Sequence, residues 1–128
     1  MVKIIVDTSV FVDHIRADKG ALRELLLLQK SKKALLYIPS IVILELWRGL
    51  SMDNLNVQKS VERMLLGIRI VDLTKQLARK AGELVRNEMV VDSEDAIIAA
   101  TALYLDAQLA TNNRRHFQKI KNLRFFKN

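Results

Sequence analysis

The sequence contains no cysteine and only one proline among its 128 residues. The lack of cysteine excludes disulfide bridges and thiolate metal ligands, and it fits a protein of the reducing cytoplasm. No run of about 18 apolar residues is present, so a membrane-spanning helix is not expected. The first residues pass from one lysine directly into an apolar run that ends in an acid, unlike a secretory signal peptide. We therefore expect one cytoplasmic domain, residues 1–128, without membrane association.

Several common catalytic signatures are also missing. There is no glycine-rich phosphate loop, which argues against a nucleotide-binding enzyme. The two histidines, His14 and His116, form no HxxxH or HExxH pair and do not by themselves indicate a metal site. Ser9 has no histidine base in a triad arrangement, so the sequence argues against nucleophilic catalysis of the serine-hydrolase type.

Positive charge exceeds negative charge, with 21 lysine and arginine residues against 14 acids and a formal net charge of +7. Such an excess indicates a polyanionic partner, of which nucleic acid is the commonest. The alternative is a simple soluble cation, since many small basic proteins bind no polyanion.

Short apolar runs alternate with amphipathic segments along the chain. The runs typical of strands are 2–6, 35–38, 68–71, 108–110 and 123–126. Helical spacing of apolar residues marks 9–16, 19–30, 41–50, 54–66, a segment after Thr74, and 93–105. This alternation predicts an α/β fold with a central parallel sheet of four to five strands, covered on both faces.

Small polar residues at helix starts predict which side chains cap the helices. We expect Asp18, Ser40 and Thr74 to act as N-caps, because their oxygens can accept hydrogen bonds from the first helical amides. Either Asp92 or Ser93 is expected to cap the segment 93–105.

Asp7 ends the first apolar run, within Val6-Asp7-Thr8-Ser9-Val10. The run has the continuous β-branched character of a strand buried on both faces. Asp7 is then expected at the carboxyl end of that strand, where open α/β sheets place their ligand crevices. The alternative role is local, as a cap of the helix that follows.

Glu45 interrupts an otherwise apolar helix, Ile41-Val42-Ile43-Leu44-Glu45-Leu46-Trp47. Burying an unpaired carboxylate there would cost several kcal/mol. A divalent cation would offset that cost, which makes Glu45 a candidate metal ligand. The alternative is a solvent-facing pair with Arg48, one helical turn later.

Asp95 lies in the acidic start of an apolar helix, Asp92-Ser93-Glu94-Asp95. Acids in a first helical turn interact favourably with the helix dipole, which is a sufficient local explanation for all three acids. The functional interpretation is that Asp95 points to the sheet edge and meets Asp7 and Glu45. Asp92 and Glu94 are assigned mainly to capping and to solvent, and a supporting role at the site is left open for Glu94.

A polar segment follows the short strand 108–110. It contains Thr111, Asn113, Arg114 and Arg115. Thr111 and Asn113 are candidates to orient water or a metal-bound phosphate, and the two arginines are candidates to hold phosphates. The alternative is a solvated turn in which an asparagine caps a helix.

Taken together, four stretches closely resemble the PIN-domain family, and in particular the VapC-type toxins of type II toxin–antitoxin systems. They are Val6–Val10, Ser40–Leu46, Asp95–Ala102 and Ala110–Asn113. The order and spacing of the polar residues also fit, with 38 residues from Asp7 to Glu45, 50 to Asp95 and 18 to Asn113. The resemblance covers nearly the whole chain.

The resemblance implies a three-layer α/β/α fold, a Mg²⁺- or Mn²⁺-dependent endoribonuclease, a homodimer and a neutralising VapB-like antitoxin. It assigns the family's acidic positions to Asp7, Glu45 and Asp95, and its fourth polar position to Asn113, where several relatives carry aspartate. It also places the hydroxyls of Thr8, Ser9 and Thr111 near the site. The pair His116-Phe117 stands where many relatives have Asp-Phe.

These residues allow a metal-assisted hydrolysis of RNA. Asp7 and Asp95 would hold the ion, with Glu45 bound directly or through water. Glu45 or Asp95 would accept the proton of the attacking water. Two other interpretations remain: a catalytically impaired PIN-like protein that binds RNA or a partner, and an RNA- or DNA-processing nuclease that is not a toxin.

Overall fold

The computed structural model describes residues 1–127, and within them the chain alternates between strands and helices. The elements run β1 (Val2–Val6), α1 (Thr8–Ala17), α2 (Leu22–Lys30), β2 (Ala34–Pro39), α3 (Ser40–Gly49), α4 (Leu55–Leu65), β3 (Arg69–Val71), α5 (Lys75–Arg86), α6 (Ser93–Leu105), β4 (Gln108–Ala110), a 3₁₀ turn η1 (Arg114–His116) and β5 (Arg124–Phe125). The expected elements are therefore all present, with ends shifted by a few residues.

The strands form one five-stranded parallel sheet in the order β3-β2-β1-β4-β5. The central strand β1 pairs with β2 on one side and with β4 on the other. Its residues Ile4, Ile5 and Val6 are at most 1% exposed, as expected for an apolar run that is covered on both faces. The predicted parallel sheet of four to five strands is confirmed.

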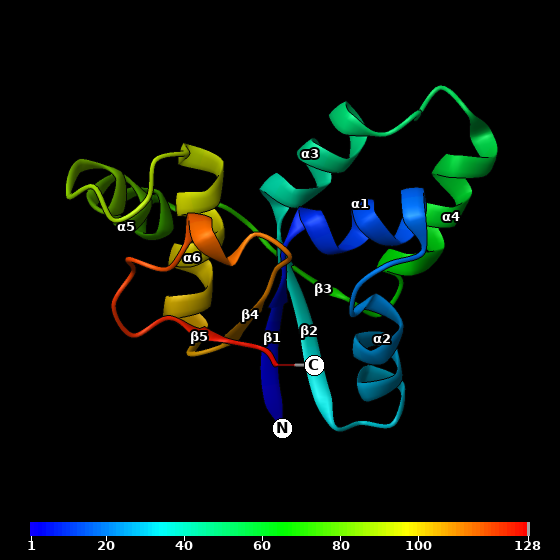
Figure 1. Cartoon of the computed structure of the whole chain (residues 1–128), viewed down its shortest axis with the longest axis horizontal. Coiled ribbons are helices and arrows are strands. Elements are labelled where there is room, and N and C mark those ends of the chain that lie inside the picture. The colour runs from blue at the N-terminus through cyan, green and yellow to red at the C-terminus, as the bar shows by residue number, and fades with distance from the viewer. Residues whose placement is uncertain (128) are drawn as a thin grey trace.

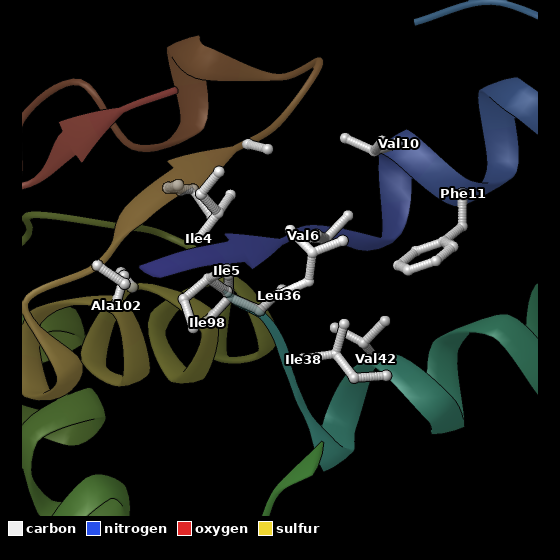
Figure 2. Packing of buried hydrophobic residues seen from close by; sticks show 14 of the residues in the cluster. Ile4, Ile5, Val6, Val10, Phe11, Leu36, Ile38, Val42, Ile98 and Ala102 are labelled. Atoms are coloured by element: carbon white, nitrogen blue, oxygen red, sulfur yellow. The ribbon is translucent and has the colours of Figure 1, made fainter. Parts of the chain in front are cut away.

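Helices cover both faces of the sheet, which gives the three layers that the resemblance implied. In Figure 1, α5 and α6 lie on one side of the sheet, and α1 to α4 lie on the other. Helix α6 packs against β1, β2 and β4, while α2 packs against β2. Figure 2 shows Ile98 and Ala102 of α6 beside Ile5 in this core.

Helix α6 is suited to close contact with the sheet because its inward face is built from small residues. Ala96, Ala99, Ala100 and Ala102 are fully buried. Thr101 is also buried, and its hydroxyl donates to the carbonyl of Ile97 at 2.7 Å, so its polar group is satisfied within the helix. None of the helices in residues 1–127 has the length and apolar character needed to cross a bilayer.

Two of the expected caps are confirmed and two are wrong. The hydroxyl of Thr74 accepts a hydrogen bond from the amide of Leu77 at 3.2 Å, and Asp92 accepts from Glu94 at 2.7 Å and Asp95 at 3.2 Å. Ser40 is the first helical residue of α3, preceded by Pro39 without a side-chain cap. Asp18 ends α1 in the left-handed conformation, a position that favours residues tolerant of positive φ.

Candidate active site

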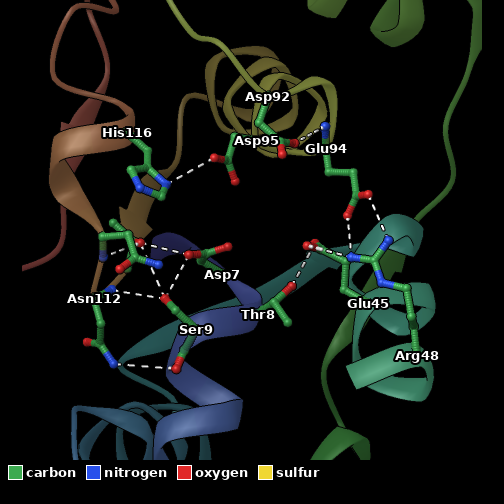
Figure 3. A network of polar contacts seen from close by, with 12 residues as sticks. Asp7, Thr8, Ser9, Glu45, Arg48, Asp92, Glu94, Asp95, Asn112 and His116 are labelled. Atoms are coloured by element: carbon green, nitrogen blue, oxygen red, sulfur yellow. Dashed lines mark hydrogen bonds and ion pairs between the residues drawn. The ribbon is translucent and has the colours of Figure 1, made fainter. Parts of the chain in front are cut away.

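The polar side chains gather where the order of strands reverses. The chain passes from β1 to β2 and β3 on one side of β1, and then crosses through α5 and α6 to β4 on the other side. Such a reversal places a crevice at the carboxyl ends of β1 and β4. Asp7 follows β1 directly, Thr111 follows β4, and α3 begins where β2 ends. The start of α6 reaches the same edge, and Figure 3 shows the carboxylates of Asp7, Glu45 and Asp95 facing a common space.

Asp7 is held by hydroxyl groups rather than by the amides of a helix. Its side chain belongs to a residue that is 4% exposed, and it does not cap α1. Instead, its Oδ2 accepts hydrogen bonds from Ser9 Oγ and from Thr111 Oγ1, both at 2.7 Å. The local capping role considered for Asp7 is therefore wrong, and its second oxygen is left to face the crevice (Figure 3).

The connection after β4 is fastened to the start of α1. The amide of Asn112 donates to Ser9 Oγ at 3.0 Å, and its side-chain amide donates to Asp13 Oδ2 at 2.7 Å. The amide of Asn113 donates to Thr111 Oγ1 at 3.0 Å. These bonds fix the hydroxyls that orient Asp7.

Glu45 comes from α3 and is turned toward the crevice, with a side chain only 17% exposed. Thr8 Oγ1 donates to its Oε1 at 2.8 Å. Arg48 lies 3.8 Å away, but this arginine makes its close pair with Glu94 of α6, through two contacts of 3.0 and 3.1 Å. The pairing of Glu45 with Arg48 is thus present, but it does not place Glu45 in solvent.

The pKa of Glu45 is raised from its usual 4.5 to about 7, and burial is the largest cause. The neighbouring carboxylate of Glu94 and the negative charge of Asp7 contribute to this rise, and the Thr8 hydroxyl opposes it. Glu45 is therefore poised to bind or release a proton near neutral pH.

The backbone position of Asp95 is fixed by the N-cap of its own helix, α6. The side chain of Asp92 accepts a hydrogen bond from the amide of Asp95, and this bond fixes the first turn of α6 at the sheet edge. The side chain of Asp95 is 18% exposed, and its Oδ2 lies 3.2 Å from Nδ1 of His116. The pKa of Asp95 is raised to about 6: burial is the largest cause, the charges of Asp7 and Asp92 add to the rise, and His116 opposes it.

Residues 4–123 match the family profile described as PIN domain. The chain belongs to the PIN-domain family. It is 32% identical over 125 residues to the ribonuclease VapC10 of Mycobacterium tuberculosis, a match that covers 94% of this chain and 90% of that protein. It is 30% identical over 123 residues to the ribonuclease VapC19 of the same organism, covering 93% and 95% of the two chains.

Solved structures show the same PIN fold. A chain of the DNA-bound VapBC complex from Salmonella typhimurium superposes with a TM-score of 0.80 at 28% identity, and 98% of each chain is covered. A chain of VapBC2 from Rickettsia felis, bound to a fragment of promoter DNA, gives a TM-score of 0.81 at 26% identity, again over 98% of both chains.

The donor set of this PIN domain fits a hard, hydrated cation. All three candidate ligands are carboxylates, and the charge of Asp7 raises the pKa of both Glu45 and Asp95. That repulsion is what a bound cation would relieve. Within residues 1–127, however, no three histidine, aspartate or glutamate side chains stand close enough to ligate one ion together. The arrangement therefore suits Mg²⁺, which keeps several waters and binds through one or two carboxylates.

The two candidate phosphate ligands of the PIN domain face different surroundings. Arg114 donates to the carbonyl of Phe126 at 2.9 Å, and its guanidinium lies 5.4 Å from the centre of the Phe125 ring. It is therefore engaged with the C-terminal strand. Arg115 instead lines a cavity of about 430 Å³ beside Asp95, together with His116 and Lys119.

Four side chains at this edge were not singled out for it by sequence reasoning. His116 contacts Asp95, Arg48 and Glu94 join α3 to α6, and Asn112 ties α1 to β4. A signal existed for His116, because it occupies a position where many relatives have an acid. No signal existed for the Arg48–Glu94 pair, since its members lie 46 residues apart in sequence.

Proposed function

We propose that this PIN domain, formed by the whole chain from 1 to 128, is a metal-dependent endoribonuclease and the toxin of a VapBC-like system. The observation that carries the proposal is that Asp7, Glu45 and Asp95, three carboxylates with little exposure to solvent, face a common space at one edge of the sheet. The relatives named as ribonucleases and the neighbours named as VapBC complexes support it.

Asp7 and Asp95 would hold Mg²⁺ or Mn²⁺, with Glu45 joining through water. When bound, the ion would supply a Lewis acid that contacts the scissile phosphate and lowers the pKa of a water. Ser9 and Thr111 keep Asp7 oriented, and Thr8 does the same for Glu45. Asn113 is proposed to orient the water or the phosphate at the family's fourth polar position.

Glu45 is the better of the two candidates to accept a proton from the attacking water. A base is most effective when its pKa lies near the working pH, and the pKa of Glu45 is raised to about 7. Arg115 is proposed to grip the RNA backbone from the cavity next to Asp95. For Arg114 the same role requires release of its contact with the Phe126 carbonyl.

Cleavage of mixed single-stranded RNA tests the proposal directly. We expect the purified chain to cut RNA with Mg²⁺ or Mn²⁺ and to stop when EDTA removes the metal. Asp7→Asn and Asp95→Asn should lower the cleavage rate by more than about 100-fold, because they remove ligand charge from the site. Asp53→Asn, at an exposed position away from the sheet edge, is the matched control and should retain the parent's rate.

Absence of cleavage at any metal concentration, with RNA binding intact, would favour a catalytically impaired binding protein instead.

The toxin role has a separate test in bacterial growth. Expression of the parent should arrest growth and expression of Asp95→Ala should not, while a coexpressed VapB-like antitoxin should restore growth. Cleavage without growth arrest would favour an RNA-processing nuclease. We place this action in the cytoplasm and propose a homodimer, which light scattering of the purified chain would check.

A further inference from the structure

A second cavity, of about 560 Å³, adjoins the cavity beside Asp95. One of its walls is α5 and α6, and the other is the segment after η1, from 120 to 122. Met89, in the α5–α6 connection, lines both cavities, so the two lie next to each other. Figure 1 shows the orange and red segment after η1 lying on the side of the sheet covered by these two helices.

The second cavity combines an apolar floor with a cationic rim. Leu84 and Ile120 are each 6% exposed, and they form the floor with Leu103 and Met89. Lys80 and Lys121 also line the cavity and bring two positive charges to it. Within residues 1–127 neither lysine makes an ion pair, so both charges are available to a ligand.

Two carboxamides complete the lining of this cavity, from Asn87 and Asn122. Each carboxamide offers both a donor and an acceptor, which matches the edge of a nucleobase. The volume lies within the range of about 300–1,000 Å³ that is usual for small-molecule sites. The apolar floor, the amide groups and the lysines together offer contacts to the three parts of a nucleotide, and the lysines are the contacts for its phosphate.

The charge of the lining residues becomes more positive from the first cavity to the second. The first cavity mixes the acids Glu88, Asp92 and Asp95 with Arg115 and Lys119, whereas no acid lines the second. A neighbouring hollow shares Lys80 and continues along α5 with Lys75, Arg79 and the acid Glu83, so cations still outnumber acids there. A polyanionic strand that has its cleaved phosphate near Asp95 would therefore find more positive charge around Lys80 than in the first cavity.

We infer that the cavity between α5, α6 and residues 120–122 is a nucleotide subsite that holds a base flanking the cleaved phosphate of a single-stranded RNA. This inference rests on the proposed function, because it takes RNA as the substrate. The strand passes from Asp95 over Lys119 to the second cavity, where Lys80 and Lys121 neutralise its phosphates. The cavity thereby adds affinity and some choice of base, and it takes no part in the chemistry.

Binding without cleavage tests the subsite independently of catalysis. The probe is a fluorescein-labelled 12-nucleotide RNA of mixed sequence, measured by anisotropy in EDTA from 50 to 200 mM salt. Lys80→Ala/Lys121→Ala should weaken binding about tenfold at 50 mM salt and lower the salt slope by about 1.4, since a single strand contributes about 0.7 for each phosphate contact. Lys30→Ala/Lys33→Ala is the control. It also removes two positive charges, but just before the amino end of β2, and it should change RNA affinity by less than about twofold.

A filling variant separates a shaped subsite from a merely basic surface. Leu103→Trp should weaken RNA binding without changing the salt slope, because it removes space and not charge. Tyr104→Trp, on the exposed side of the same helix, is the control and should bind as the parent does. Circular dichroism and thermal unfolding check that each variant is folded.

A third measurement requires no substitution. In NMR spectra of the parent chain, nucleoside 5′-monophosphates should shift the side-chain amide signals of Asn87 and Asn122. Any one of three results would overturn the subsite. The folded Leu103→Trp variant could bind RNA as tightly as the parent, the two lysine-pair variants could lose equal affinity, or the amide signals of Asn87 and Asn122 could stay unshifted. Failure of the parent to cleave RNA would instead overturn the proposed function and leave these binding results as they stand.

Discussion

At the scale of single residues, Glu45 is a candidate site residue that lowers the stability of the folded chain. Its carboxylate lies in a mainly apolar helix, near two other negative charges, and its pKa is raised to about 7. Below its usual pKa of 4.5, Glu45 is protonated in both the folded and the unfolded chain. As the pH rises toward 7, the unfolded chain releases the proton first, so Glu45 lowers stability progressively and most fully above pH 7.

Glu45→Gln should therefore stabilise the metal-free protein at high pH. Glutamine retains an oxygen that can accept from Thr8, but it has no charge to desolvate. We expect a gain of about 1–2 kcal/mol in the free energy of unfolding at pH 8, a reduced figure because the site is partly solvated. At pH 4 the gain should vanish. Urea unfolding in EDTA at both pH values measures it.

The control for this substitution is Glu83→Gln, on an exposed part of α5, which also removes one negative charge. A gain that is the same at pH 4 and pH 8 would contradict the desolvation of Glu45.

Residues that act through local patterns were predictable from sequence, whereas those that act across the fold were not. Asp7 at the end of an apolar run and Glu45 inside an apolar helix both conflict with simple burial, and that conflict is visible in the sequence. The contact of His116 with Asp95 depends on how η1 packs beside α6. The bidentate contact of Arg48 with Glu94 depends in the same way on how α3 approaches α6. No local pattern contains that information.

At the scale of elements, the first turn of α6 does two things at once. Asp92 satisfies two amides that the helix itself leaves free, and one of them belongs to Asp95. The cap thus stabilises the helix and also fixes the backbone of a candidate ligand.

Asp92→Ala should lower both stability and RNA cleavage. Loss of the cap should reduce the free energy of unfolding by about 1 kcal/mol. We expect a cleavage rate about 10- to 100-fold lower, because the backbone that orients Asp95 is released. Asp92→Asn can still accept both amides, so it should retain most of the stability and rate. Urea unfolding and a cleavage assay on the same samples make the measurement.

Thr74→Ala is the matched control at the element scale, since Thr74 caps α5 through the amide of Leu77. It should lose a similar amount of stability with little change in cleavage. Equal losses of cleavage in Asp92→Ala and Thr74→Ala would show that general destabilisation, and not the position of Asp95, is responsible.

Most elements were predictable because each carries its own periodicity, and Leu77, Ala81 and Leu84 of α5 are an example. The two failed caps show the limit of that approach. Ser40 has the residue type of an N-cap, but β2 continues to Pro39 and the helix begins one residue earlier than expected. Asp18 likewise ends a helix that runs further than its apolar residues indicate.

At the scale of the whole molecule, the site belongs to the complete sheet. Asp7, Glu45 and Asp95 lie on three segments that only the order β2-β1-β4 and the packing of α6 bring together. A small single domain of this kind usually unfolds in one cooperative step. The activity should therefore persist until the domain unfolds and then disappear with it.

Thermal loss of RNA cleavage should consequently coincide with the loss of helical circular dichroism. Ile98→Ala provides a second point, because Ile98 is fully buried in the core beside Ile5 and has no polar group at the site. Its removal should cost about 3 kcal/mol and move both midpoints down together. Loss of cleavage well below the unfolding midpoint, in either protein, would show that the site opens separately.

The bond between Thr111 and Asp7 spans 104 residues, and it has a consequence for the time of synthesis. On the ribosome, Asp7 and Ser9 are made early, but Thr111, the second hydroxyl that orients Asp7, is translated 104 residues after Asp7. Until β4 leaves the exit tunnel and pairs with β1, the growing polypeptide has no complete nuclease centre. A translating cell would thus be protected from each toxin molecule until Thr111 has been made and has reached Asp7.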